Sequence, residues 1–283
     1  MKSICFLLIC MVLNNFVEAQ NKLKFDRRYV ESEDKWVVLQ AGIADTVYSF
    51  GFIYIDSNAG LTLNSEGTFT INKYGRFIPK RDTMYSEKTR LPNNNTKVAV
   101  IPSSYFADLG IKEYPDWLAG YKSDTTSVKH LFKWGYMYNG WDMYDKALTY
   151  LERAEKTEPD FKGLQTELAF SYNAIHKYDK AITALQRVLK NGAADCYTYK
   201  ELSYAQQHLD LLKEAENTYQ TSLATCANKS MKGEMAYNLC HKYYELKDRI
   251  KFTYWKTETE KWITEGDKYS RSLNTMAKEL QIN

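Results

Sequence analysis

The feature that most constrains the fold of this chain is a period of 34 residues in its second half. Residues 144–151 read YDKALTYL, residues 178–185 read YDKAITAL, and residues 212–219 read LKEAENTY. Each segment stands 34 positions after the one before it, and the apolar residues around them have helical spacing. A chain that repeats at this length builds a stack of similar units, each of which buries the apolar face of its neighbour.

Positions that would let two helices approach closely recur in the same register. Small residues stand at Gly135, Ala169 and Ser203 in the first predicted helix of each unit, and at Ala147, Ala181 and Ala215 in the second. In this pattern residues 128–262 resemble the tetratricopeptide repeat (TPR) family, whose unit is a hairpin of two helices. The resemblance implies an α-helical TPR solenoid with three clear repeats, at residues 128–161, 162–195 and 196–229.

The repeat pattern weakens toward the C-terminus. Residues 230–263 form a degenerate fourth repeat, because Arg249 falls where the earlier repeats have a small alanine. Residues 264–283 predict an amphipathic C-terminal helix, with Tyr269, Leu273 and Met276 at helical spacing. Such a helix would cap the stack, since the last hairpin has no further neighbour to cover it.

The N-terminal half has a strand period instead. In residues 20–122 the alternation places four aromatic side chains, Tyr48, Phe50, Phe52 and Tyr54, on one face of a strand. We expect an antiparallel meander with turns at residues 56–60 and 64–67, and a short helix at 115–118 that covers the sheet. The polar cluster at 123–127 predicts a linker. The fold class is therefore α+β: an N-terminal antiparallel β-rich domain followed by the helical solenoid.

The first nineteen residues have the pattern of an export signal. Lys2 supplies a positive charge, residues 4–13 are apolar, and Val17 and Ala19 stand three and one positions before a cleavage point at Gln20. The apolar run is too short to anchor the chain in a bilayer. The sequence therefore predicts a secreted or periplasmic protein whose mature chain starts at Gln20.

The cysteines suggest one disulfide. Cys5 and Cys10 lie in the predicted signal, so the mature chain keeps Cys196, Cys226 and Cys240. Antiparallel packing of the third hairpin would bring Cys196 and Cys226 together, whereas Cys240 falls in the middle of a helix as a buried thiol. The alternative is that Cys196 and Cys226 stay reduced and buried.

Composition and motifs speak against several classes of function. Lys and Arg number 38 against 35 Asp and Glu, so no strong basic field would attract nucleic acid. The four histidines, His130, His176, His208 and His241, have neither metal-ligand spacing nor a partner carboxylate at such spacing. We expect no metal, no cofactor and no enzymatic activity, because nucleophile and phosphate-loop motifs are lacking.

The resemblance also implies a binding groove, because the first helices of TPR hairpins line the concave side of the stack. Aromatic residues would stand there at Tyr136, Phe170 and Tyr204, with Asn238 in the fourth repeat, and polar residues at Asn139, Asn173, Gln207 and His241. Exposed amides could pair with the backbone of an extended peptide while rings cover its side chains. The alternative for the aromatic residues is packing between repeats.

Two functions from different classes follow. In the first, the chain is an exported adaptor or scaffold that holds a protein or extended peptide in the TPR groove. In the second, the β-rich domain is a carbohydrate-binding or hydrolytic module and the helices are its scaffold. An open helical groove beside a filled β core would favour the first, and a polar β cleft with converging carboxylates the second.

Overall fold

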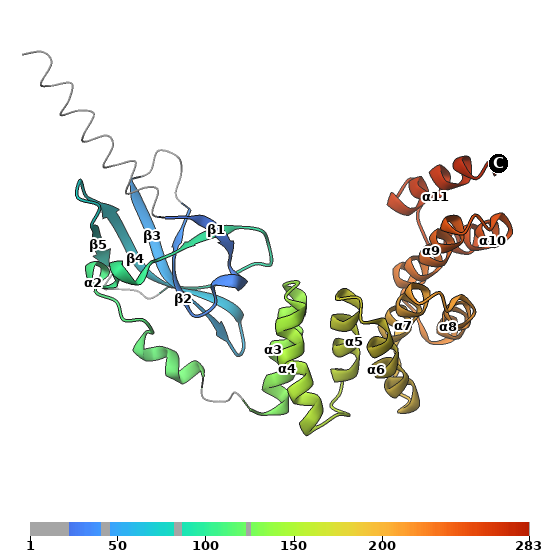
Figure 1. Ribbon diagram of the computed structural model, residues 1–283, viewed down its shortest axis with the longest axis horizontal. Helices are drawn as coiled ribbons and strands as arrows, with labels where there is room; N and C mark the ends of the chain where they lie inside the picture. The colour runs from blue at the N-terminus through green and yellow to red at the C-terminus, as the bar shows by residue number, and fades with distance from the viewer. Residues whose placement is uncertain (1–22, 41–45, 82–86, 123–125, 283) are drawn as a thin grey trace, which may run out of the picture. The chain divides into compact units, whose positions relative to one another are not determined.

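The computed structural model describes residues 23–40, 46–81, 87–122 and 126–282, and the chain divides into two compact units, Met1–Thr125 and Thr126–Asn283. The first unit is a β-sheet with short helices and the second is a run of helical hairpins (Figure 1). The predicted signal peptide at 1–19 lies outside the described residues, as does most of the predicted linker at 123–127. The expected α+β fold class is confirmed.

In the described residues of the first unit, seven strands form one sheet whose pairings are all antiparallel. Its order is β1-β7-β2-β3-β4-β5, and β6 pairs with β4. The strands are β1 (Phe25–Arg28), β2 (Lys35–Leu39), β3 (Val47–Asp56), β4 (Gly60–Ile71), β5 (Phe77–Arg81), β6 (Lys88–Arg90) and β7 (Lys97–Val100). The hairpin between β3 and β4 turns at residues 56–60, as the polar sequence predicts.

The aromatic residues of β3 fill the core of this unit. Tyr48, Phe50, Phe52 and Tyr54 are buried on one face, as their alternation requires. A 3₁₀ helix, η3 (Asp116–Tyr121), follows Pro115 and covers them: the Trp117 ring lies 4.9 Å from the ring of Tyr54 and 5.9 Å from that of Phe52. The short helix α2 (Phe106–Leu109) adds Leu109 to the same core.

The expected turn at residues 64–67 is wrong, because β4 continues through it. The pairing with β3 shifts there, so that Phe50 faces Gly67 while Gly51 faces Ser65. Glu66 is thereby the extra residue of a β-bulge. Gly67 has a φ of 140°, and a Cβ on Gly51 would collide with the carbonyl oxygen of Asn64. The glycines therefore permit a bend within a strand and not a chain reversal.

Residues 126–282 form four helical hairpins and a final helix, an arrangement consistent with TPR-like repeats. Figure 1 shows the hairpins following one another along the chain. The pairs are α3 (Val128–Gly140) with α4 (Tyr144–Thr157), α5 (Leu164–Ala174) with α6 (Tyr178–Lys190), α7 (Cys196–His208) with α8 (Leu212–Thr225), and α9 (Lys229–Glu245) with α10 (Arg249–Glu260); α11 (Lys268–Glu279) follows. Ala147, Ala181 and Ala215 are fully buried, and a Cβ on Gly135 would overlap Leu151.

The turn inside each hairpin has one residue in the left-handed conformation. These residues are Asp142, His176, Asp210 and Lys247, with φ between 57° and 61°. The first three follow the 34-residue period, but Lys247 comes three residues later because α9 is longer than α7. After that shift Phe252, fully buried, stands where Ala215 stands in the third hairpin. An extended α9 therefore explains why Arg249 breaks the sequence pattern.

Candidate functional site

Two neighbouring pockets lie along the first helices of the second, third and fourth hairpins. The acidic pocket, of about 240 Å³, is lined by Phe170 and Asn173 from α5, Lys200 and Glu201 from α7, and Glu234 from α9. The histidine pocket, of about 310 Å³, is lined by Gln207 and His208 from α7 and by His241, Lys242 and Glu245 from α9. Tyr204 and Asn238 line both pockets. The two hollows are therefore parts of one groove.

The amide residues predicted for this groove are not exposed. Asn139 and Asn173 are each 3% exposed and Gln207 is 6% exposed, so the expectation of free amides is wrong. Asn139 Nδ2 donates to the backbone oxygen of Glu167, at 3.1 Å, and to its Oε2, at 2.9 Å. Asn173 repeats this clasp on Glu201, at 3.0 Å and 2.9 Å. Each asparagine therefore ties its hairpin to the first helix of the next one.

The third amide breaks the series. At the place of Glu167 and Glu201 the fourth hairpin has Met235, whose side chain offers no carboxylate. Gln207 instead bonds within its own helix, where Nε2 donates to Ser203 Oγ at 3.0 Å. The clasp could have been recognised in the sequence, since Asn139 and Asn173 each precede a glutamate by the same 28 residues.

The side-chain oxygen of the clasp asparagine is satisfied in the first hairpin and unsatisfied in the second. Ser171 Oγ donates to Asn139 Oδ1 at 2.6 Å. Ala205 stands at the position of Ser171 one period later and carries no hydroxyl. Asn173 Oδ1 is buried and accepts no hydrogen bond from any part of the chain that the structure describes. A buried acceptor without a partner costs stability, so this atom calls for an explanation.

Two of the three predicted aromatic residues, Phe170 and Tyr204, both pack between repeats and line the groove, whereas Tyr136 lines neither pocket. Tyr136 is 59% exposed, whereas Phe170 and Tyr204 are half-buried. The Phe170 ring lies 5.9 Å from that of Tyr144 in the preceding hairpin, and the Tyr204 ring lies 6.3 Å from that of Tyr178. Phe170 and Tyr204 nevertheless contribute to the pocket walls, so the two predicted roles coexist.

The two remaining candidates, Asn238 and His241, are half-buried on α9. Asn238 lies between the two pockets and lines both of them. His241 Nδ1 lies 3.5 Å from Glu245 Oε1 in the histidine pocket. On the opposite wall, burial and the nearby charges of Lys242 and His176 hold the pKa of His208 below its ordinary value. His208 is therefore neutral at pH 7.

Charges in the acidic pocket interact with one another and with Glu167, which lies outside its lining. Burial opposes protonation of Lys200, but the carboxylates of Glu201 and Glu234 outweigh it, and the pKa of Lys200 lies above its ordinary value. Burial raises the pKa of Glu167, which also feels the negative charge of Glu201, although the bond from Asn139 opposes the rise. Lys200 is consequently a cation at neutral pH, held between carboxylates.

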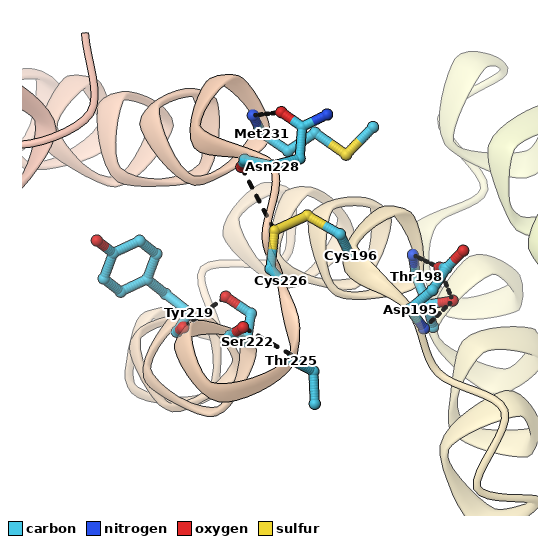
Figure 2. Close-up of a disulfide and its surroundings, with 9 residues drawn as sticks. All are labelled: Asp195, Cys196, Thr198, Tyr219, Ser222, Thr225, Cys226, Asn228 and Met231. Atoms are coloured by element: carbon cyan, nitrogen blue, oxygen red, sulfur yellow. Dashed lines mark hydrogen bonds between the residues drawn. A yellow bond between two sulfur atoms is a disulfide. The ribbon is translucent and has the colours of Figure 1, made fainter.

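A disulfide joins Cys196, the first residue of α7, to Cys226, just after α8 (Figure 2). Their Cα atoms are 4.6 Å apart, within the range that a disulfide spans. Asp195 caps α7 beside the bridge through the backbone N–H of Thr198, at 2.8 Å. The third cysteine among the described residues, Cys240, is a buried thiol, and burial raises its pKa to about 12.

Within residues 23–40, 46–81, 87–122 and 126–282, no three His, Cys, Asp or Glu side chains are grouped so as to hold a metal ion. No helix in those ranges is long and apolar enough to cross a membrane.

Comparison with known proteins gives a partial likeness. No protein-family model matches the chain, and no curated protein matches it. A solved structure of MamA AMB-1 shares 20% identity, with a TM-score of 0.42 over 52% of this chain and 78% of that one. A structure of MamA MSR-1 shares 19% identity, with a TM-score of 0.39 over 56% of this chain and 82% of that one.

Proposed function

We propose that this chain is a protein-interaction scaffold whose helical unit holds an extended segment of another polypeptide in the groove formed by α5, α7 and α9. The observation that carries the proposal is the pair of contiguous pockets that share Tyr204 and Asn238. Successive pockets along one groove suit the successive side chains of an extended segment, and half-buried polar groups between them suit its backbone.

The β unit gives less support to the alternative of a carbohydrate-binding or hydrolytic module. Its aromatic row is buried: Phe50 is 1% exposed, while Phe52 and Tyr54 are completely covered. Rings inside a core have no face left on which a sugar could stack. A filled aromatic core in one unit and a hollowed groove in the other agree with the adaptor hypothesis.

We also propose that the chain is exported, which gives the scaffold a place to act outside the cytoplasm. The proposal rests on the signal-like residues 1–19, and the bridge between Cys196 and Cys226 is compatible with an oxidising compartment. N-terminal sequencing of the protein from its host should begin at or near Gln20. Recovery of intact Met1 in a soluble cytosolic fraction would refute export.

Site-specific photocrosslinking tests the groove directly. The photoreactive residue p-benzoylphenylalanine would replace Tyr204, which lines both pockets, or Tyr254, a partly exposed tyrosine of α10 near Gln220 of α8. Both positions are aromatic, so both variants should fold, which circular dichroism would verify. We expect a crosslinked polypeptide from position 204 and none from position 254. The reverse result would move the binding surface out of the groove.

A further inference from the structure

The acidic pocket contains more negative charge than its own cation neutralises. Lys200 Nζ lies 3.3 Å from Glu201 Oε1 and 3.5 Å from Glu234 Oε1, so a single ammonium is shared by two carboxylates. Both distances exceed the roughly 2.8 Å of a strong charge-assisted hydrogen bond. The Glu234 side chain keeps 36% of its surface exposed at the pocket wall. One carboxylate is therefore left without a full counterion, and Glu167 adds a further negative charge near Glu201.

The residue that carries the unsatisfied acceptor of the clasp, Asn173, belongs to the lining of this same pocket. Asn173 lines it and is 3% exposed, and its Nδ2 is already committed to Glu201. Its Oδ1 has lone pairs and no donor among the described residues. The equivalent Asn139 in the first hairpin accepts a hydrogen bond from Ser171. The unpaired acceptor therefore occurs at the asparagine that lines the pocket and not at its equivalent. Carboxylate oxygens and an unpaired amide oxygen all favour a ligand that brings N–H donors and positive charge.

Aromatic rings complete this environment. Phe170 and Tyr204 line the pocket with the two glutamates. The ammonium of Lys200 already lies over the ring of the neighbouring Tyr197, 5.2 Å from its centroid. Lys200 is thus itself a cation that contacts both carboxylates and an aromatic face, the same combination of groups that the pocket offers to a ligand.

We infer that the acidic pocket binds a basic side chain of the polypeptide held in the groove, with arginine preferred over lysine. A guanidinium is planar and has five N–H donors, so it can pair with Glu234, donate toward Asn173 and stack on Phe170 or Tyr204 at once. An ammonium makes the ion pair but stacks less well. This inference rests on the proposed function, because it names the chemistry of a partner for the same groove.

Blocked tripeptides with a single variable side chain test the inference. The full chain would be titrated with acetyl-Gly-Xaa-Gly-amide, where Xaa is Arg, Lys, Gln or Glu, and binding followed by NMR. We expect the Arg peptide to bind about tenfold more tightly than the Gln peptide, as one charge-assisted contact provides. Glu234→Gln should remove most of that difference, because it keeps the shape of the side chain and loses its charge.

Glu214→Gln is the matched control, because Glu214 is an exposed residue of α8 outside the pocket. The substitution changes the net charge of the protein by the same amount as Glu234→Gln. It should leave the preference for the Arg peptide unchanged. Four results would each overturn the inference that the pocket binds a basic side chain. They are equal binding of the Arg and Gln peptides, tighter binding of the Glu peptide, absence of peptide binding, and equal effects of the two variants. Crosslinking at position 204 would still test separately whether the groove binds a polypeptide. Failure of the basic-side-chain inference can therefore be told apart from failure of the proposed function.

Discussion

The difference between the second and third hairpins gives a reciprocal pair of stability predictions. Ser171 is fully buried and supplies the donor to Asn139 Oδ1, whereas Ala205 leaves Asn173 Oδ1 unpaired. Ser171→Ala should leave a second buried acceptor without a donor. Ala205→Ser should supply the donor that the third hairpin lacks. One substitution is therefore expected to lower the free energy of unfolding, and the other to raise it.

The magnitude follows from two opposing effects. An unpaired buried acceptor costs about 1–3 kcal/mol, and serine is a poorer helix former than alanine by about 0.5 kcal/mol. Ser171→Ala incurs the cost of the unpaired acceptor and gains the helix preference of alanine, a net destabilisation of about 0.5–2.5 kcal/mol. Ala205→Ser gains a hydrogen bond of about 1 kcal/mol and loses the helix preference, a net stabilisation of about 0.5 kcal/mol.

Urea unfolding of the full chain, followed by far-UV circular dichroism, measures both changes. Ala181→Ser is the control, because it inserts a hydroxyl at another fully buried helical alanine. The unpaired acceptor of the described helices belongs to Asn173, so this hydroxyl has none to bond and should lower the free energy of unfolding. If Ala205→Ser destabilises as much as Ala181→Ser, then Asn173 Oδ1 is not within reach of residue 205. The equivalence of the two clasps, and the reasoning built on it, would be refuted.

Three further predictions concern single interactions. Cys196→Ser with Cys226→Ser should lower the free energy of unfolding by about 3.6 kcal/mol, because the bridge closes a loop with a sequence separation of 30. An unchanged urea midpoint would contradict this prediction. Because the pKa of Glu167 is raised in the folded state, its ionised form opposes folding above pH 4.5; Glu167→Gln should stabilise at pH 7, by an amount that shrinks as the pH falls. Lys247→Gly should stabilise by about 1 kcal/mol, since glycine adopts the left-handed conformation without strain, and calorimetry would show a higher melting temperature.

The helical hairpins were predictable because their signals are local. Helix spacing, small residues at close approach and a fixed period all lie within 34 residues, and the structure places Ala147 and Ala181 where that pattern requires. The fourth hairpin was misaligned from Arg249 onward, because three additional residues in the first helix shift the register.

The exposure of the groove amides was predicted wrongly because it depends on the next hairpin. Asn139 is polar and lies on a first helix, so its sequence context favours solvent. It becomes buried because Glu167, 28 residues later, presents both a carboxylate and a backbone oxygen to its amide. In the β unit Gly67 was misread for a similar reason: a turn and a bulge both need glycine, and only the pairing with β3 distinguishes them.

The candidate site arises where the repeats stop being alike. If Ala205 were serine, Asn173 would be satisfied like Asn139, and no acceptor would be left over at the acidic pocket. If Met235 were glutamate, Gln207 would have a carboxylate opposite it on the next hairpin instead of bonding within its own helix. Identical repeats stabilise the stack by saturating each other's polar groups. The departures from identity at positions 205 and 235 leave polar groups of α5 and α7 without inter-repeat partners, one at Asn173 in the acidic pocket and one at Gln207 in the histidine pocket.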